Sequence, residues 1–161
     1  MVIMEDIKHI KGFLDSNNAK TLFERLLKLD WEQPVIKIFG KATPIPRKQL
    51  LFTTPEVTNT YTYSGLKLRK VFFEGAIEEL KLLVEKRLGM SFNTALVNLY
   101  QNGDDYVGWH SDDESLLGTE PTIVSVSLGG SRLFHLRKKK DKSNKNKFLL
   151  ENGDLFITGS S

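Results

Sequence analysis

A histidine and an aspartate two positions apart, His110 and Asp112, are the residues in this chain best suited to metal chemistry. On extended backbone the side chains of residues i and i+2 point to the same side, so both can reach one point. A second histidine would complete the triad of two histidines and one carboxylate that holds non-haem Fe(II) and leaves coordination positions open. An isolated His-x-Asp triplet is more often ordinary surface polarity, so its neighbours must decide between these interpretations.

Polar residues before and after His110 and Asp112 favour a binding site over ordinary surface polarity. The apolar run 95–97 predicts a strand, and Asn98 and Tyr100 fall on one face of that strand. Two polar residues on one face of an apolar strand indicate hydrogen bonding into a pocket. Asp113 and Glu114 add two carboxylates directly after Asp112, which is more acid than a surface turn needs.

Several short segments, in a fixed order between residues 35 and 136, share their residue types with one known family. They are FGK (39–41), PRKQ (46–49), YTYSGL (61–66), NLY (98–100), NGD (102–104), GWHSDDE (108–114) and PTIVSVSLG (121–129). Together they resemble the AlkB family of Fe(II)- and 2-oxoglutarate-dependent dioxygenases, which demethylate alkylated bases of nucleic acids. Within that family the resemblance is strongest to members that repair double-stranded DNA.

The resemblance implies a cofactor set and residues that hold it. His110 and Asp112, with one further histidine, would bind Fe(II) and would therefore be the catalytic and metal-binding residues. Asn98 and Tyr100 would hydrogen-bond the carboxylates of the co-substrate 2-oxoglutarate. With O2, such enzymes oxidise the N-methyl group of 1-methyladenine or 3-methylcytosine, and the methyl carbon leaves as formaldehyde.

The resemblance also implies which residues contact the substrate. Phe39 would enter the duplex stack where a base has been extruded, although its place at the end of an apolar strand by itself favours burial. Stacking of an aromatic ring on the flipped base contributes about 1–3 kcal/mol. Alternatively, the tyrosines of segment 61–66 form the aromatic face of a strand, and the acids after Asp112 lie in a solvated turn. The other predicted substrate contacts are Tyr61, Tyr63, Ser64, Asp113 and Glu114.

The charge distribution indicates an anionic partner. Lysine and arginine number 23 against 20 aspartates and glutamates, for a net charge of +3. The stretch 137–147, RKKKDKSNKNK, concentrates basic residues around a single acid. Phosphates accept such point charges without fixed geometry, although a solvated hairpin loop is the plainer interpretation. The possible phosphate contacts are Arg47, Lys48, Arg137, Lys138, Lys139 and Lys140.

Composition excludes several classes of protein. The chain has 161 residues and no cysteine, so it has no disulfide framework and no cysteine-based zinc site. No apolar run is long enough to span a membrane, and the N-terminal residues lack the pattern of a secretory signal. We therefore expect a monomeric intracellular protein, cytoplasmic or nuclear.

The hydrophobic pattern predicts an α+β fold. Helical spacing is weak over 4–14 and clear over 19–29 and 72–88. Two prolines predict a loop over 43–49. Short strands are expected at 35–40, 50–53, 95–97, 122–128, 132–136, 147–150 and 154–158. Glycine turns predict that 122–128 pairs with 132–136 and that 147–150 pairs with 154–158.

The family implies that these strands form a double-stranded β-helix, or jelly-roll, with supporting N-terminal helices. We expect one domain over 1–161, with helices and substrate-binding hairpins to about residue 90 and the jelly-roll core from about 91. The family places its third metal ligand, and an arginine for the far carboxylate of 2-oxoglutarate, on strands that follow residues 153–159. The sequence ends before either, and His135 lies too early, so we expect a C-terminal truncation that removes strands of the jelly-roll.

Three functions fit these features. Oxidative demethylation of alkylated DNA is favoured, with duplex DNA as the expected substrate, and an AlkB-like demethylase of RNA shares the same chemistry. A non-catalytic module that binds lesions would follow if the protein ended at Ser161. Formaldehyde release from a methylated oligonucleotide, with Fe(II) and 2-oxoglutarate added, separates the enzymes from the binding module.

Overall fold

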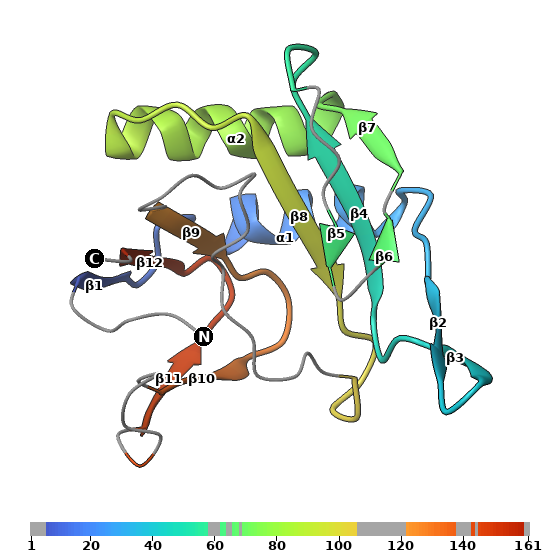
Figure 1. Cartoon of the computed structure of the whole chain (residues 1–161). Coiled ribbons are helices and arrows are strands. Elements are labelled where there is room, and N and C mark those ends of the chain that lie inside the picture. The colour runs from blue at the N-terminus through green and yellow to red at the C-terminus, as the bar shows by residue number, and fades with distance from the viewer. Residues whose placement is uncertain are drawn as a thin grey trace. The chain divides into compact units, whose positions relative to one another are not determined.

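The computed structural model describes residues 6–57, 62–63, 66–67, 69–105, 122–137, 143 and 145–159. The chain divides into two compact units, residues 1–27 with 109–161 and residues 28–108, and Figure 1 labels the elements of both. The elements are β1 (Asp6–Ile10), α1 (Ser16–Leu27), β2 (Val35–Ile38), β3 (Lys41–Pro44), β4 (Lys48–Thr53), β5 (Thr62–Tyr63), β6 (Leu66–Lys67), β7 (Lys70–Phe72), α2 (Gly75–Leu88), β8 (Thr94–Leu99), β9 (Thr122–Val126), β10 (Arg132–Arg137), β11 (Lys145–Leu150) and β12 (Leu155–Gly159). Among these residues no helix is both long and apolar enough to cross a membrane.

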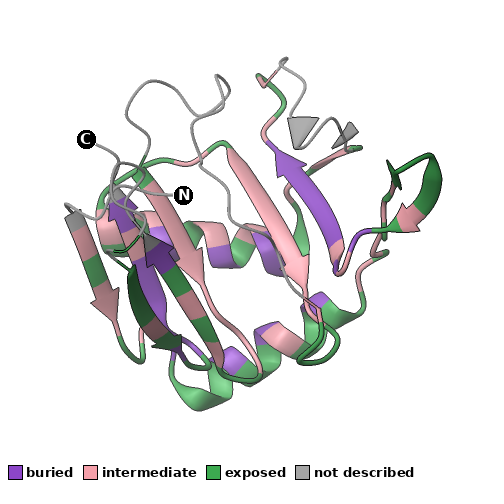
Figure 2. Ribbon diagram, turned by 60° about the horizontal axis from the view of Figure 1, so that its bottom comes forward, coloured by how far each residue is buried: buried purple, intermediate pink, exposed green. Residues whose placement is uncertain are grey.

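The unit of residues 28–108 is built on a three-stranded sheet with β4 in the centre. β4 runs parallel to β7 and antiparallel to β8. Residues 49–53 of β4 are all buried (Figure 2), which is the pattern of a strand covered on both faces. The ring of Phe73, just before α2, lies 5.9 Å from that of Phe52 on β4.

Helix α2 confirms most of the prediction for residues 72–88. Its buried residues are Ala76, Ile77, Leu80 and Val84. It ends at Gly89, whose φ of 66° suits a left-handed cap and whose N–H donates to the Glu85 carbonyl at 2.8 Å. It begins at Gly75 because residues 70–72 pair with β4 as strand β7.

The hairpin of β2 and β3 differs from the prediction in its second strand. At its tip Phe39 occupies the turn with a φ of 51°, and its side chain is fully exposed, which fits the hairpin position that the resemblance implies and not the burial that its place after an apolar strand by itself favours. The predicted loop 43–49 is also wrong in part, because β3 includes Thr43 and Pro44 and β4 begins at Lys48. Pro44 is tolerated because it ends a strand of a two-stranded sheet, where a missing N–H interrupts no inner ladder.

The second unit contains a sheet in the order β1-β12-β9 and a separate pair, β10-β11. Residues 6–10 form a strand that pairs with β12, which contradicts the weak helical pattern predicted over 4–14. The cause is tertiary, because pairing with a strand 145 or more positions away overrides a local preference.

The pairing of the last four strands corrects both predicted hairpins. β9 pairs with β12, and β10 pairs with β11, so together they form one long hairpin that passes from one sheet to the other halfway along. The two crossing points are bonded to each other, since the Gly153 N–H donates to the Ser127 carbonyl at 2.7 Å. The Gly129 N–H donates to Asn152 Oδ1 at 2.9 Å. Asn152 and Gly153 thus make a crossover between sheets rather than a hairpin turn.

An aromatic cluster forms the core of this unit. Phe156 on β12 packs against Phe134 and Phe148 of the β10-β11 pair, with ring centroids 5.3 and 4.9 Å apart. Leu136 and Leu150 complete the buried cluster. A strand of one sheet therefore contacts side chains of the other sheet, which is how two sheets share one core.

Replacing Gly153 by alanine should lower the free energy of unfolding by about 2 kcal/mol. Gly153 has a φ of 86°, and an added Cβ would lie 2.5 Å from the Leu14 carbonyl oxygen. Urea unfolding of the variant and of Gly130→Ala measures the effect, because at Gly130 no atom lies within 4 Å of an added Cβ. Equal stability of the two variants would contradict the close approach of Leu14 to this turn.

Candidate functional site

A buried polar row runs across strands β4 and β8. Gln49 on β4 lies directly opposite Asn98 on β8, so their side chains share one face of the sheet. Their side-chain amides contact each other at 2.8 Å. Arg47, two residues before Gln49, places its Nε and Nη2 atoms 3.0 and 3.2 Å from the same terminal atom of Gln49. Gln49 is 1% exposed and Arg47 is 3% exposed.

These contacts decide how the amides are oriented. Oxygen and nitrogen of an amide have the same shape, so their placement follows from the hydrogen bonds they can make. In one orientation Gln49 Nε2 donates to Asn98 Oδ1, but that nitrogen then faces the donors of Arg47. A guanidinium has donors only, so we assign the shared atom as Gln49 Oε1. Asn98 must then turn its Nδ2 toward Gln49, because two carbonyl oxygens cannot bond to each other.

The donors on this face suit a carboxylate ligand. Asn98 Nδ2 carries two hydrogens, of which one meets Gln49 and the second can be donated to a ligand. Tyr100 follows β8 and is half-buried, as is Asn98, and a phenol is also a hydrogen-bond donor. An amide N–H and a phenol O–H are the groups that hold a carboxylate without a full charge, so the donor set fits the predicted binding of 2-oxoglutarate.

Comparison with known proteins assigns the family. The chain matches the description "2OG-Fe(II) oxygenase superfamily" over residues 6–161. This chain belongs to that superfamily. It is 36% identical over 141 residues to the DNA oxidative demethylase ALKBH2 of Arabidopsis thaliana. The matched residues make up 85% of this chain and 45% of the relative.

The predicted resemblance to the AlkB family is confirmed by further relatives. The chain is 35% identical over 150 residues to the human alpha-ketoglutarate-dependent dioxygenase alkB homolog 3, with 89% of this chain and 47% of the relative covered. The DNA oxidative demethylase ALKBH2 of Mus musculus is 38% identical over 107 residues, which is 66% of this chain and 44% of the relative. The chain therefore spans about half the length of the curated relatives it matches.

Most of the predicted oxygenase site lies outside the described residues. These positions include the expected iron ligands His110 and Asp112, and also Tyr61, Ser64, Asp113, Glu114, Lys138, Lys139 and Lys140. Of Tyr63 and Arg137 the structure describes only the backbone, in β5 and β10. Within the described ranges no group of three or more histidine, cysteine, aspartate or glutamate residues is arranged to hold a metal. The iron site therefore stays a prediction.

Two predicted phosphate contacts differ in exposure. Arg47 is buried beside Gln49, so we do not carry it forward as a contact to a phosphate on the surface. Lys48 is half-buried on the opposite face of the strand. The contact of Gln49 with Arg47 and Asn98 was not predicted, although the two-residue spacing from Arg47 in the PRKQ segment places both on one face once residue 48 is known to begin a strand.

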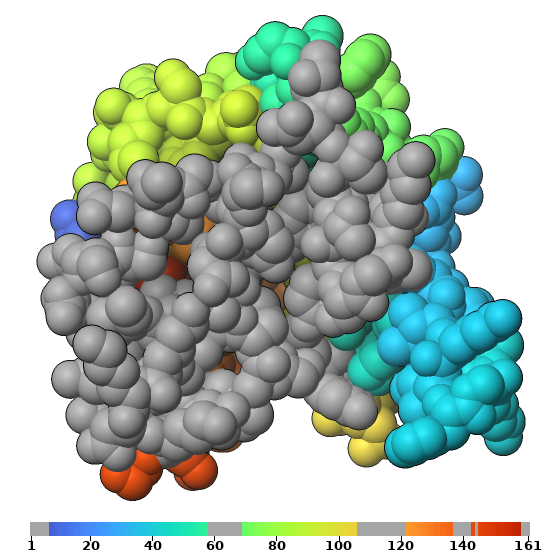
Figure 3. All heavy atoms as spheres, in the orientation of Figure 1, coloured from blue at the N-terminus to red at the C-terminus, as the bar shows by residue number. Residues whose placement is uncertain are grey.

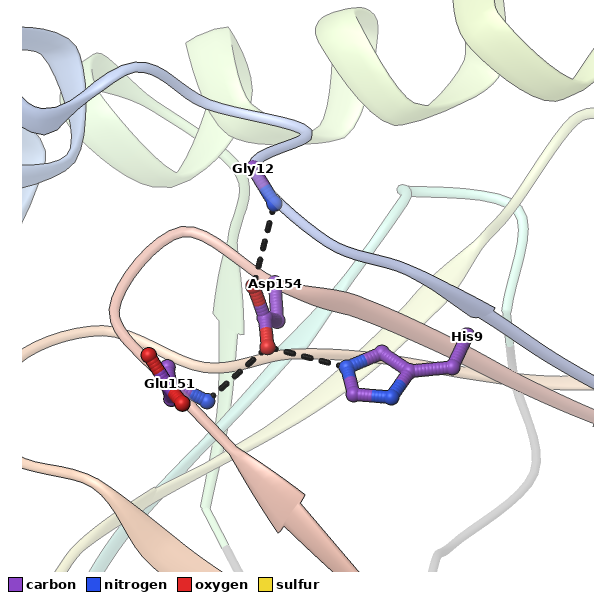
Figure 4. A network of polar contacts seen from close by, with 4 residues as sticks. All are labelled: His9, Gly12, Glu151 and Asp154. Atoms are coloured by element: carbon purple, nitrogen blue, oxygen red, sulfur yellow. Dashed lines mark hydrogen bonds and ion pairs between the residues drawn. The ribbon is translucent and has the colours of Figure 1, made fainter.

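A second polar network, in the unit of residues 1–27 and 109–161, centres on Asp154 (Figure 4). The carboxylate accepts from the Gly12 N–H at 3.0 Å, from the Glu151 N–H at 3.0 Å and contacts His9 Nε2 at 2.9 Å. Burial by itself raises the pKa of Asp154, but the hydrogen bonds from Glu151, Gly12 and His9 outweigh it and the net pKa lies below its usual value. Asp154 therefore joins β1 to the crossover before β12 as a carboxylate, which is a structural role.

Proposed function

We propose that this protein is an Fe(II)- and 2-oxoglutarate-dependent dioxygenase that demethylates N-alkylated bases of DNA, with 1-methyladenine and 3-methylcytosine as substrates. The observation that carries the proposal is 36% identity over 141 residues to a protein named DNA oxidative demethylase. Superfamily membership over residues 6–161 supports the same cofactors. Action on DNA would place the protein in the cytoplasm or nucleus, depending on the organism.

Two sets of residues would have different roles in the proposed site, one in binding the metal and one in binding the co-substrate. His110 and Asp112 would bind Fe(II), which with 2-oxoglutarate and O2 supplies the oxidation of the methyl group. Asn98 and Tyr100 would bind and orient the carboxylates of 2-oxoglutarate. The half-buried Asn98 and its tie to the buried Gln49 support this role, because an oriented donor loses little entropy when the ligand binds.

The hairpin of β2 and β3 favours duplex DNA as the substrate. Its exposed large hydrophobic residues are Val35, Ile38 and Phe39, and the hairpin is visible at the surface in Figure 3. Phe39 sits at the turn between Lys37 on β2 and Lys41 on β3. A protruding ring between two cations suits insertion into a base stack, because the ring replaces lost stacking and the lysines can contact phosphates.

The strand pairing supports the jelly-roll expected of the family. In such a fold a long hairpin bends so that its outer and inner halves lie in different sheets. The pairs β9-β12 and β10-β11, with their bonded crossings at Ser127 and Gly153, have this form. Tyr61, Tyr63, Ser64, Asp113 and Glu114 would then form the pocket for the flipped base.

Formaldehyde release tests the function directly. Full-length protein with Fe(II), 2-oxoglutarate and O2 should release formaldehyde from oligonucleotides that carry 1-methyladenine or 3-methylcytosine, and faster from duplex than from single strands. Faster turnover of methylated RNA would instead support the RNA demethylase. Lesion binding without turnover would support the non-catalytic module.

Replacing Phe39 by alanine should lower turnover on duplex substrate by about tenfold and leave single-strand turnover within about twofold. Loss of ring stacking removes about 1–3 kcal/mol only where a stack must be opened. The matched control is Phe72→Ala, which removes another exposed aromatic side chain and should change neither rate. Equal losses on duplex and single strand would reject the role of a wedge.

A further inference from the structure

We propose that Gln49 is a positioning residue that fixes the amide of Asn98 with an N–H directed at the carboxylate of 2-oxoglutarate. The inference rests on the proposed function, because it names a residue that prepares the same co-substrate site. Gln49 itself would not contact the ligand. It acts through one oxygen atom, whose orientation the neighbouring guanidinium determines.

Gln49 is held by its backbone on one side and by its side chain on the other. Its side chain contacts Asn98, its partner across the antiparallel pair β4-β8. Its backbone N–H donates to the Glu32 carbonyl at 2.7 Å, and the Glu32 N–H donates back to the Gln49 carbonyl at 3.3 Å. Glu32 thus pairs with Gln49 along the edge of β4 that faces β7. Farther along this edge, residues 51–53 of β4 pair with β7 itself. Gln49 therefore cannot shift without breaking its two backbone bonds to Glu32 and its side-chain contact with Asn98.

The side chain of Gln49 is oriented by charge. The two nitrogen atoms of Arg47, at 3.0 and 3.2 Å, both point donors at one terminal atom of the amide. In a site that is 1% exposed, a cation at this distance strongly favours the oxygen over the NH2 group. Reversing the Gln49 amide would place its NH2 group against the donors of Arg47 and would turn its carbonyl oxygen away from them.

The orientation of the Gln49 amide determines that of the Asn98 amide. With Gln49 Oε1 as the acceptor at 2.8 Å, the favoured rotamer of Asn98 has its Nδ2 on that side. Without Gln49, a half turn of the Asn98 amide would present Oδ1 to the ligand site at no cost. A carbonyl oxygen next to a carboxylate repels it, so loss of the acceptor should weaken the binding of 2-oxoglutarate even though Asn98 remains.

Two substitutions of Gln49 distinguish the acceptor role from packing. Gln49→Glu keeps an oxygen acceptor beside Arg47, whereas Gln49→Met keeps the length of the side chain and removes the acceptor. Gln49→Glu should bind 2-oxoglutarate within about threefold of wild type, and Gln49→Met should bind it at least about tenfold more weakly, the usual range for an outer contact of this type. The control is Leu50→Met, a volume-conserving change on the other face of β4.

The measurement is calorimetric titration of 2-oxoglutarate into full-length protein loaded with Mn(II) under anaerobic conditions, where no turnover occurs. As a second readout, Gln49→Met should raise the KM for 2-oxoglutarate and leave the KM for the methylated oligonucleotide unchanged. A purely structural effect would instead lower the unfolding midpoint and affect both substrates. If Gln49→Met does not fold, the affinity of Gln49→Glu alone decides whether an acceptor suffices.

The outcomes separate this inference from the proposed function. Wild type that binds no 2-oxoglutarate would reject the proposed function and this role with it. Wild-type binding with equal affinity in Gln49→Met would reject this role alone. Equal weakening by Gln49→Glu and Gln49→Met would also overturn it, because Gln49 would then be a donor to Asn98.

Discussion

Replacing His110 by alanine should abolish stoichiometric iron binding and lower demethylation of a methylated oligonucleotide by at least about a thousandfold. Loss of the metal removes several kcal/mol of stabilisation at the reacting atoms, and each 1.4 kcal/mol corresponds to about tenfold in rate. Asp112→Asn should have a similar effect, because an amide keeps the shape of the ligand and removes the charge that neutralises Fe(II). Metal analysis after dialysis and formaldehyde release measure the two parts of the effect.

His135→Ala is the matched control for this experiment. His135 lies on β10 and is exposed, and the family places no ligand there, so the variant should keep both iron and turnover. If His110→Ala retained iron while His135→Ala lost it, the metal site would have to be reassigned to the β10-β11 pair. Loss in both variants would indicate that the two histidines share one site.

Replacing Asp154 by alanine should lower the free energy of unfolding by about 3 kcal/mol at pH 7. The change leaves the N–H groups of Gly12 and Glu151 without their acceptor and removes the carboxylate beside His9. Bonds to a charged acceptor contribute about 1.5–3 kcal/mol each, part of which water recovers at the half-exposed side of the network. Urea unfolding measures the loss, and Glu151→Gln, which keeps the backbone N–H in the network, should be neutral.

The same carboxylate should make stability depend on acid. The pKa of Asp154 is lower in the folded protein than its usual value of 3.8, so ionised Asp154 stabilises the fold above about pH 4. That contribution is lost as the pH falls through the folded pKa. The difference in unfolding free energy between wild type and Asp154→Asn should therefore shrink as the pH falls from 4 to 2. A difference that persisted unchanged at pH 2 would contradict an ionised Asp154.

The periodic elements could be predicted because their signals are local. Helix α2 follows from apolar residues three and four apart and from Gly89, which only has to be compatible with a positive φ. The family could be recognised for a related reason, since chemistry demands particular residue types at short spacing. His110 and Asp112 are two positions apart whatever the distant parts of the chain do.

The partners of the strands could not be predicted in the same way. A turn such as Asn152 and Gly153 is equally suited to a tight hairpin and to a crossover between sheets. Only the bonds of these residues to Ser127 and Gly129 select the crossover. Likewise, Phe39 reads as the buried end of an apolar strand until the tight pairing of β2 with β3 turns it outward at the hairpin tip.

The sequence by itself determined the family, the candidate iron ligands and the two helices, because each depends on residues close together along the chain. Tertiary structure alone decided that β1 pairs with β12, that Asp154 holds the N-terminal strand and that Arg47 turns inward to Gln49. Those contacts join residues that are distant in sequence or change the face a side chain occupies. Their free energy arises from burial and hydrogen bonds between segments, which no local pattern encodes.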